Sequence, residues 1–296
     1  MNKTTISLEF FPPRSETQLR RFWYTLGCLQ TLKPSHISMT WGALGAASQA
    51  SLDILEPLMK ESIVPVTAHL SCSGETRTSM LEKIETLENL GVKHFLALRG
   101  DQGNSEFNAV TQDGSTACLQ HASDLVALLA ERGHEHISVA AYPDVHPEST
   151  NKSSDIQWLR HKLDAGANQA ITQFFFESES FLRFRDRSEA AGISQKLIPG
   201  ILPIHDIDKV SQFSEKCGAV VPTELLSQFQ HAKSQEDKHK AAVEQCLSLC
   251  RELEAEGVDE FHLYTLNQSA LAYEIGSELL GSGPARTGKA SESAAA

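Results

Sequence analysis

Short apolar segments alternate with longer amphipathic segments along most of the chain. The short segments are rich in β-branched and aromatic residues, as buried strands are, and the long ones repeat apolar residues at helical spacing. We expect strands at residues 6–10, 36–40, 64–70, 94–98, 137–141, 169–172, 197–201 and 261–264. This alternation is typical of βα units that build a parallel sheet.

Eight such units predict an α/β fold, a (β/α)8 TIM barrel. The length of 296 residues is usual for such a barrel. No Gly-x-Gly-x-x-Gly motif follows a predicted strand, which disfavours a doubly wound dinucleotide-binding sheet. We therefore expect a single catalytic barrel over residues 1–280. Residues 281–296 are mostly Gly, Ser and Ala, and we expect them to form a disordered tail.

The composition excludes several classes of protein. With 41% hydrophobic and 22% charged residues, the chain has the composition of an ordinary soluble globular protein. A formal net charge of -12, from 26 basic and 38 acidic residues, argues against binding to nucleic acid. No apolar run is long enough to cross a membrane, and a strand pattern starts directly after the N-terminus, so we expect a cytoplasmic protein without a signal peptide. The six cysteines lack the spacing of a zinc site, and we expect no metal.

An acidic residue interrupts the first apolar segment. Glu9 lies within Ser-Leu-Glu-Phe-Phe, just before Pro12 and Pro13. An unpaired carboxylate inside an apolar strand is costly unless it takes up a proton, so its position needs an explanation. A buried ion pair, a strand end that reaches water and a chemical role all remain open at this point.

Polar side chains also end most of the other predicted strands. In a barrel, the carboxyl ends of the strands form the catalytic face. Alone, His69 is better explained as a buried core histidine, and Asp155 with Lys162 as a solvated helix face. The polar segment that begins at Asp101 is long enough to be an active-site loop. Together, the strand ends predict a catalytic face that carries Glu9, Thr40, His69, Arg99, Asp101, Tyr142, His146, Gln173 and Tyr264.

Several segments resemble those of the bacterial methylenetetrahydrofolate reductases, in the order of that family. They are SLEFFPPR, SMTWGA, AHLSC, ALRGD, VAAYPDVHPE, DAGANQAITQFFF, IPGILPI and FHLYTLN. The resemblance implies a flavin-dependent (β/α)8 barrel that reduces 5,10-methylenetetrahydrofolate to 5-methyltetrahydrofolate, a step of one-carbon metabolism toward methionine. It further implies FAD as cofactor, NADH or NADPH as electron donor, and a homo-oligomer.

The resemblance also assigns roles to individual residues. Glu9 matches a general acid that would protonate N10 of the folate as its imidazolidine ring opens. Asp101 matches a second catalytic acid, between flavin and pterin. Gln173 matches a residue that contacts folate and nicotinamide in turn. The expected substrate-binding residues are Gln173, Lys209, Phe213, Tyr264 and Gln268.

An extensive FAD site follows from the same resemblance. Arg99 and Lys162 would supply positive charge for the pyrophosphate. The implied mechanism is ping-pong, in which nicotinamide and folate use one pocket in turn. The expected cofactor-binding residues are Thr40, Trp41, Ala43, His69, Arg99, Gly100, Asp101, Ala122, Ala140, Tyr142, His146, Asp155, Trp158, His161 and Lys162.

Some positions depart from the family pattern. Trp41 stands where tyrosine is frequent, and Trp158 and His161 stand where some relatives have polar or basic residues. Gln268 stands where arginine is usual, and Lys209 offers a substitute charge for the folate tail. The altered cofactor positions leave open a flavin-free reductase with direct hydride transfer from NAD(P)H to folate. A non-catalytic folate- or flavin-binding barrel is the third hypothesis.

Overall fold

The structure is a computed structural model that describes residues 3–40, 46–100, 118–146, 149 and 151–281. The strands are β1 (Thr5–Phe10), β2 (Ile37–Met39), β3 (Val66–Ser71), β4 (His94–Leu98), β5 (His136–Ala141), β6 (Gln169–Thr172), β7 (Lys196–Ile198), β8 (Gly200–Ile201) and β9 (Glu260–Tyr264). The helices are α1 (Glu16–Gln30), α2 (Ala46–Glu61), α3 (Arg77–Asn89), α4 (Ala122–Glu131), α5 (Lys152–Asp164), α6 (Ser178–Ala190), α7 (Ile207–Cys217), α8 (Thr223–His231), α9 (Gln235–Ala255) and α10 (Ser269–Leu279). Within these ranges, no helix is long and apolar enough to cross a membrane.

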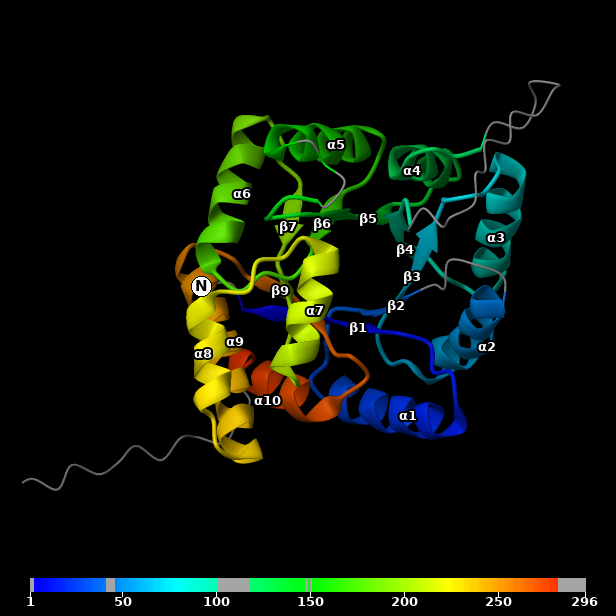
Figure 1. Cartoon of the computed structure of the whole chain (residues 1–296). Helices are drawn as coiled ribbons and strands as arrows, with labels where there is room; N and C mark the ends of the chain where they lie inside the picture. Colours follow the sequence, from blue (N-terminus) through cyan, green and yellow to red (C-terminus); the bar gives the residue numbers. More distant parts are fainter. Residues whose placement is uncertain (1–2, 41–45, 101–117, 147–148, 150, 282–296) are drawn as a thin grey trace, which may run out of the picture.

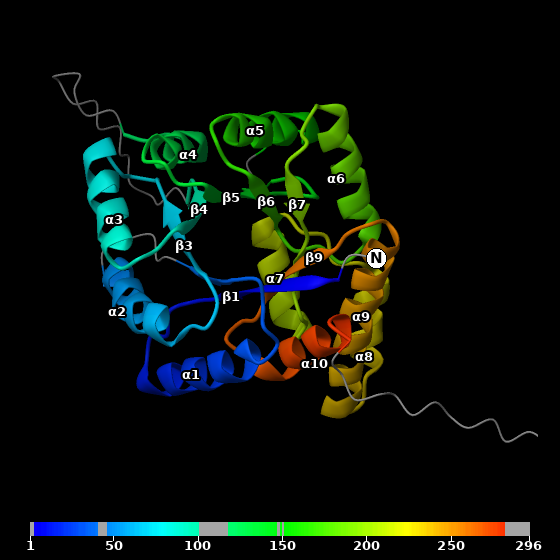
Figure 2. The same cartoon turned by 180° about the vertical axis from the view of Figure 1, so that it is seen from behind.

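The strands form a nearly closed parallel barrel with the helices outside it (Figure 1). The strand order is β7-β6-β5-β4-β3-β2-β1-β9-β8. The first strand therefore pairs with the last, and Glu9 lies opposite Tyr264 in that pair. Helix α7 lies in front of the strands in Figure 1 and behind them in the opposite view of Figure 2. The α/β barrel predicted from the alternation is confirmed.

The strand predicted at residues 197–201 is divided into two strands in the structure, so the prediction of one continuous strand was wrong. Pro199 separates β7, which pairs with β6, from β8, which pairs with β9. Proline has no backbone N–H to donate to a strand ladder, which explains the break. Its carbonyl still accepts a hydrogen bond from the His262 N–H at 2.9 Å. The two short strands together occupy the seventh position and bring β6 and β9 toward closure.

Alternate residues of β1 point to the helix layer and into the barrel. Phe10 is fully buried in the outer layer, where its ring meets Phe22 of α1 edge to face with centroids 5.6 Å apart. Ser7 and Glu9 point the other way, and the Ser7 hydroxyl contacts His262 of β9. The barrel interior beside β1 is therefore polar, whereas branched apolar residues dominate most barrels of this type.

Candidate functional site

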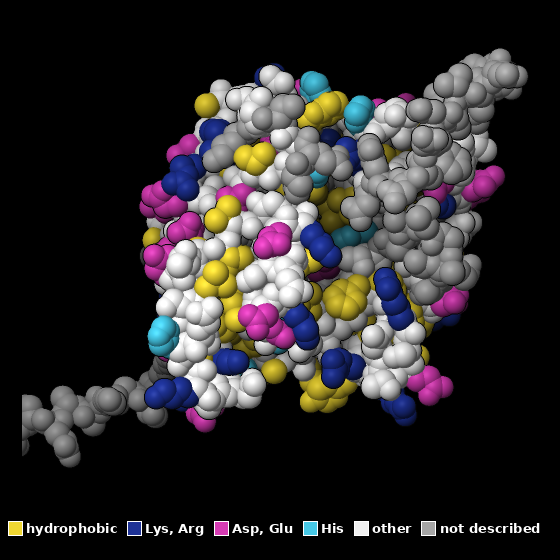
Figure 3. All heavy atoms as spheres, in the orientation of Figure 1, with side chains coloured by type: hydrophobic (Ala, Val, Ile, Leu, Met, Phe, Trp, Pro, Cys, Tyr) yellow, Lys and Arg dark blue, Asp and Glu magenta, His cyan; other side chains and the backbone are white. Residues whose placement is uncertain are grey.

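A cavity of about 450 Å³ lies at the carboxyl ends of β4 and β5, bounded also by α4 and α5. Figure 3 shows this face of the molecule hollowed near its centre, with Lys and Arg side chains close to the hollow. Many residues predicted from the strand ends and from the family resemblance line the cavity. They are Arg99, Gly100, Ala122, Ala140, Tyr142, His146, Asp155, Trp158, Lys162 and Gln173.

A glycine holds the end of β4 against β3. Gly100 has a φ of 86°, in the left-handed region. The preceding carbonyl, of Arg99, accepts hydrogen bonds from the Ser71 hydroxyl at 2.9 Å and from the Ser73 N–H at 2.7 Å. A Cβ atom at position 100 would lie 1.8 Å from Ser71 Oγ, so no other residue fits without movement. This close approach places Arg99 in the cavity wall.

Helix α5 places an ammonium group and a carboxylate in the same wall. Lys162 Nζ donates a hydrogen bond to the carbonyl of Ala140. Burial lowers the pKa of Lys162 to about 8, while the nearby charge of Asp155 acts in the opposite direction. The Asp155 carboxylate accepts hydrogen bonds from the His146 N–H at 3.1 Å and from the Ser149 hydroxyl. Both charged groups are thereby held in fixed orientations at the cavity.

Aromatic rings gather around Trp158 at the cavity. Its side chain is partly exposed, and its ring lies 4.5 Å from that of His121 and 5.5 Å from that of His161. Tyr142 and His146 meet edge to face with centroids 4.5 Å apart. Trp158 and His161, two of the unusual positions in the sequence, thus belong to one aromatic group that a planar ligand could contact.

Glu9 lies inside the barrel between two histidines. Its Oε2 atom is 3.7 Å from His69 Nε2 and 3.6 Å from His262 Nε2. The Glu9 side chain is 17% exposed, whereas those of His69 and His262 are 4% and 0% exposed. Burial lowers the pKa of His69 to about 4, although attraction to Glu9 opposes this change. His69 is therefore neutral near pH 7 and is not an ion-pair partner for Glu9.

Tyr264 lies opposite Glu9 in the pairing of β1 with β9. Its hydroxyl donates a hydrogen bond to the Thr172 carbonyl at 2.7 Å, across the position of Gly200. Burial raises the pKa of Tyr264 well above its ordinary value, and the charges of Glu9 and Tyr142 add to this effect. Tyr264 is therefore a neutral hydrogen-bonding group beside the carboxyl group, and both residues lie outside the lining of the cavity.

The other predicted substrate residues lie outside the cavity lining. Phe213 on α7 is 49% exposed and stacks on Phe174, with centroids 5.6 Å apart. Lys209, one turn earlier, is exposed and lies 3.3 Å from Asp206. Gln268 is half-buried at the start of α10. These residues therefore offer exposed contacts near α7 and α10 rather than a closed binding site.

Three predicted residues, Trp41, Ala43 and Asp101, lie outside the described residues. Thr40, directly before the first two, donates its N–H to the carbonyl of Phe10 at 2.9 Å. In the described part of the chain, no group of three or more His, Cys, Asp or Glu side chains is arranged to hold a metal ion.

The sequence analysis did not single out Ser7 and His262. Ser7 Oγ lies 2.7 Å from His262 Nδ1, and both residues are buried beside Glu9. Strand alternation could have identified them, because Ser7 shares a face with Glu9 and His262 shares one with Tyr264. Their mutual contact depends on the pairing of β1 with β9.

Comparison with known proteins gives a match over nearly the whole chain. The family model for methylenetetrahydrofolate reductase matches residues 1–280. The 5,10-methylenetetrahydrofolate reductase of Pectobacterium carotovorum subsp. carotovorum is 36% identical over 274 residues, which cover 92% of this chain and 89% of the relative. That of Escherichia coli (strain K12) is 36% identical over 271 residues, which cover 91% and 88% of the two chains.

Solved structures of other proteins share the fold. An uncharacterized protein from Clostridium thermocellum that binds two copies of 5-methyl-5,6,7,8-tetrahydrofolic acid has a TM-score of 0.63 and 12% identity, over 94% of each chain. An aldo-keto reductase from Klebsiella pneumoniae in complex with NADPH has a TM-score of 0.55 and 11% identity, over 94% of this chain and 90% of that one. At these identities the likeness concerns the barrel fold alone.

Proposed function

Since the chain belongs to the methylenetetrahydrofolate reductase family, we propose that it uses NADH or NADPH and a bound FAD to reduce 5,10-methylenetetrahydrofolate to 5-methyltetrahydrofolate. The family and the names of its relatives support a reductase of methylenetetrahydrofolate. The cofactor, the electron donor, the ping-pong order and the role of Glu9 are the proposed part.

The donor set of the cavity fits FAD. Arg99 and Lys162 provide two positive groups that suit a pyrophosphate. Trp158 and Tyr142 provide rings for the planar parts of the cofactor. When bound, FAD would supply the hydride chemistry between nicotinamide and folate. Gly100 lines the same cavity, so its backbone would form part of the wall beside the cofactor.

The placement of Glu9 is the observation that carries the proposal. Its carboxyl group is largely enclosed and faces neutral His69 rather than a cation at that side. It also lies beside Tyr264, which is within electrostatic range of the cavity residue Tyr142. In this position Glu9 would be the group that donates a proton to N10 of the folate, so that the ring opens and the methylene carbon becomes able to accept hydride.

Folate and nicotinamide would use the space next to this carboxyl group in turn. Gln173 lines the cavity and would contact either ligand through its amide. The exposed ring of Phe213 would stack on the pterin or the nicotinamide. Lys209 and Gln268 would contact the outer part of the folate, where the exposed ammonium group of Lys209 suits a carboxylate.

The substitution Glu9→Gln tests the role of the carboxyl group. Under anaerobic conditions, we expect NADH to bleach the flavin of this variant at a rate within about threefold of wild type. Reoxidation by methylenetetrahydrofolate should be at least about 100-fold slower, because a general acid contributes on the order of 10²–10⁴ to the rate. Stopped-flow absorbance of the flavin separates the two half-reactions.

Glu16→Gln is the matched control for the loss of a carboxylate. Glu16 is exposed at the start of α1, and we expect both of its half-reactions to equal wild type. If folate-dependent reoxidation survives unchanged in Glu9→Gln, the proposed acid is wrong. If wild type itself is not reoxidised by methylenetetrahydrofolate, the proposed function is wrong.

The unusual residues Trp158 and His161 favour one alternative, a flavin-free reductase with direct hydride transfer to folate. The absorbance spectrum of the purified protein discriminates between the two. A colourless protein that oxidises NADH in step with folate reduction, without added FAD, would select the alternative. A yellow protein that NADH bleaches would support the FAD-dependent reaction.

A further inference from the structure

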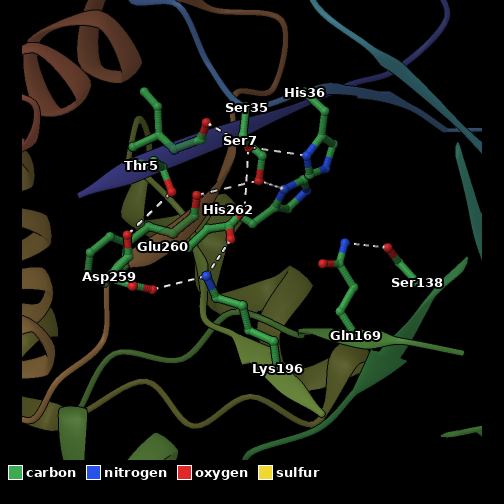
Figure 4. A network of polar contacts seen from close by, with 12 residues as sticks. Thr5, Ser7, Ser35, His36, Ser138, Gln169, Lys196, Asp259, Glu260 and His262 are labelled. Atoms are coloured by element: carbon green, nitrogen blue, oxygen red, sulfur yellow. Dashed lines mark hydrogen bonds and ion pairs between the residues drawn. The ribbon is translucent and has the colours of Figure 1, made fainter. Parts of the chain in front are cut away.

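His262 has no role in the reaction as proposed so far, although it is fully buried beside Glu9. Figure 4 shows Ser7 and His262 pointing toward each other from the neighbouring strands β1 and β9. The ring of His36 lies on another side of His262, with centroids 6.0 Å apart and planes inclined by 22°. His262 thus lies between Glu9, the proposed acid, and the ring of His36.

The two ring nitrogens of His262 have different surroundings. Nδ1 lies 2.7 Å from Ser7 Oγ, a hydrogen-bond distance. Nε2 is buried, lies 3.6 Å from Glu9 Oε2, and has no hydrogen-bond partner among the described residues. An unpaired buried nitrogen is unfavourable, and hydrogen bonds in active sites often shorten only when a ligand binds. The Glu9 carboxyl group is therefore the partner that the geometry offers to Nε2.

The contacts of Ser7 allow a chain of hydrogen bonds with a single direction. Its hydroxyl lies 2.7 Å from His262 Nδ1, and it can donate to the carbonyl of Phe261 at a longer distance of 3.5 Å. A serine hydroxyl has one proton, so a hydroxyl that donates to Phe261 has to accept from His262 Nδ1–H. In that tautomer Nε2 carries a lone pair and accepts a hydrogen bond. Glu9 can donate to it only as a protonated acid.

We propose that His262 is a positioning residue that accepts a hydrogen bond from protonated Glu9 and so keeps the proton on the carboxyl group until folate takes it. The Glu9 O–H would donate to His262 Nε2, the Nδ1–H of His262 would donate to Ser7 Oγ, and the Ser7 hydroxyl would donate to the carbonyl of Phe261. In the reaction, the Glu9 O–H bond breaks and the N10–H bond of folate forms. The carboxylate then takes a new proton from solvent after the product leaves.

The groups that face His262 are compatible with a neutral imidazole. Burial lowers the pKa of His36 on the β2 side to about 3 and that of His69 on β3 to about 4, so neither ring carries a charge near pH 7. Tyr264 on β9 meets the ring edge to face at 5.4 Å and is neutral, since its pKa is raised well above its ordinary value. Glu9 on β1 is the acid next to His262.

Charges at the amino-terminal ends of β7 and β9 are paired with one another. Lys196 Nζ lies 3.0 Å from Asp259 and 2.8 Å from Glu260 (Figure 4). The Ser35 hydroxyl lies 3.3 Å both from Glu260 Oε1, to which it can donate, and from His36 Nδ1. These acidic groups therefore have a cation of their own and do not require a protonated His262.

Nitrogen NMR of the wild-type protein tests the tautomer without any turnover. The FAD-containing protein is labelled with nitrogen-15 at its histidines, and His262→Gln identifies the His262 signals by their loss. Near pH 7 we expect the Nδ1–H tautomer. The Nε2–H tautomer or a doubly protonated ring would overturn the inference. This inference rests on the proposed function, but the measurement remains decisive about His262 whether or not wild type reduces folate.

The pH dependence of folate-dependent reoxidation tests the effect on Glu9. His262→Asn keeps an amide near Ser7 but removes the group next to Glu9, whereas His262→Gln places an amide oxygen close to the position of Nε2. Loss of one hydrogen bond to the neutral acid should move the midpoint of the alkaline limb about one pH unit lower, and so slow the step by about tenfold at pH values above the wild-type midpoint. The glutamine variant should return both values toward wild type.

Two further measurements show whether the change in the pH midpoint is specific to the contact between His262 and Glu9. Bleaching by NADH should stay within about threefold of wild type in both variants, because that half-reaction needs no proton from Glu9. His94→Gln removes another barrel histidine, one that stacks on His136 and has no contact with Glu9, and should leave the midpoint unchanged. A folded His262→Asn variant whose midpoint is unchanged or higher would contradict the proposal. If that variant does not fold, the tautomer of His262 that nitrogen NMR finds in the wild-type protein decides whether the proposal holds.

Discussion

Gly200 lacks the one atom that would separate Tyr264 from Thr172. A Cβ atom at position 200 would lie 2.2 Å from the Thr172 carbonyl oxygen and 2.6 Å from the Tyr264 ring. The hydrogen bond between these two residues, at 2.7 Å, therefore depends on glycine. At the residue scale, the orientation of a ring beside the proposed acid is decided by a missing side chain on another strand.

We expect Gly200→Ala to displace Tyr264 and to destabilise the protein. Overpacking of a dense interior costs about 1–3 kcal/mol, measured as the free energy of unfolding in urea. Gly27→Ala is the control, because nothing lies within 4 Å of a Cβ atom there, in α1. That variant should equal or exceed wild type in stability, by up to about 1 kcal/mol. A Gly200→Ala variant as stable as wild type would contradict the steric argument.

The buried histidines predict a loss of stability in acid. Burial lowers the pKa of His69 to about 4 and that of His36 to about 3, from an ordinary value of 6.5. Between those values the unfolded chain binds protons that the folded protein excludes, so the free energy of unfolding falls as the pH falls. The expected slope is about 1.4 kcal/mol per pH unit for each histidine.

Urea unfolding curves at several pH values between 6.5 and 4 measure this slope. The variant His36→Gln should show a shallower dependence, since one of the two contributions is gone. Equal slopes in wild type and variant would show that His36 is not a buried neutral group. Above pH 6.5 both proteins should show little dependence from this source.

At the scale of elements, the loop after β9 holds the end of β1 in place. Asn267 accepts a hydrogen bond from the Phe11 N–H at 3.1 Å and donates one to the Phe11 carbonyl at 2.8 Å. Thr265 donates its hydroxyl to the Glu9 carbonyl at 2.6 Å. Asn267 has a φ of 52°, a conformation that asparagine adopts more readily than most residues. The backbone around Glu9 is therefore fixed by a loop from the other end of the sequence.

Two substitutions of Asn267 separate its hydrogen bonds from its backbone conformation. Asn267→Gly and Asn267→Ala each lose both contacts to Phe11, which should cost about 1–3 kcal/mol of unfolding free energy. Alanine should cost about 1–2 kcal/mol more, since the left-handed conformation is unfavourable for it. Urea unfolding measures both. If alanine is no worse than glycine, the conformational argument is wrong.

At the scale of the whole molecule, the pairing of β1 with β9 makes the two ends of the fold interdependent. We propose that residues 1–280 form a single cooperative domain. Trp23 lies on α1 and Trp158 lies on α5, so their fluorescence reports on separate parts of the barrel. Because the first and last strands pair with each other, loss of either end of the chain removes strand pairing at the other end.

We therefore expect one unfolding transition. Curves from far-UV circular dichroism and from tryptophan fluorescence should have the same midpoint in urea. A chain shortened by residues 282–296 should give the same curves, since the barrel strands and helices lie before that point. Two separated transitions in the full chain would argue for independent units.

The sequence by itself was sufficient to predict the barrel, because the spacing of side chains along a strand and around a helix is a local property of the backbone. It also located Glu9 and the polar ends of β4 and β5, since parallel strands bring their carboxyl ends to one face. The break at Pro199, which the predicted strand at residues 197–201 did not include, has a local cause in the missing N–H of proline.

The tertiary structure alone decided which distant residues meet. Ser7 and His262 are 255 positions apart in the chain, and their contact exists because the last strand pairs with the first. The register of that pairing also sets His262 beside Glu9. The pairing of β8 with β9 brings Gly200 against Tyr264. The local sequence pattern does not predict such a register, because the register results from the pairing of the first strand with the last. The environment of the proposed acid is therefore a property of the closed barrel.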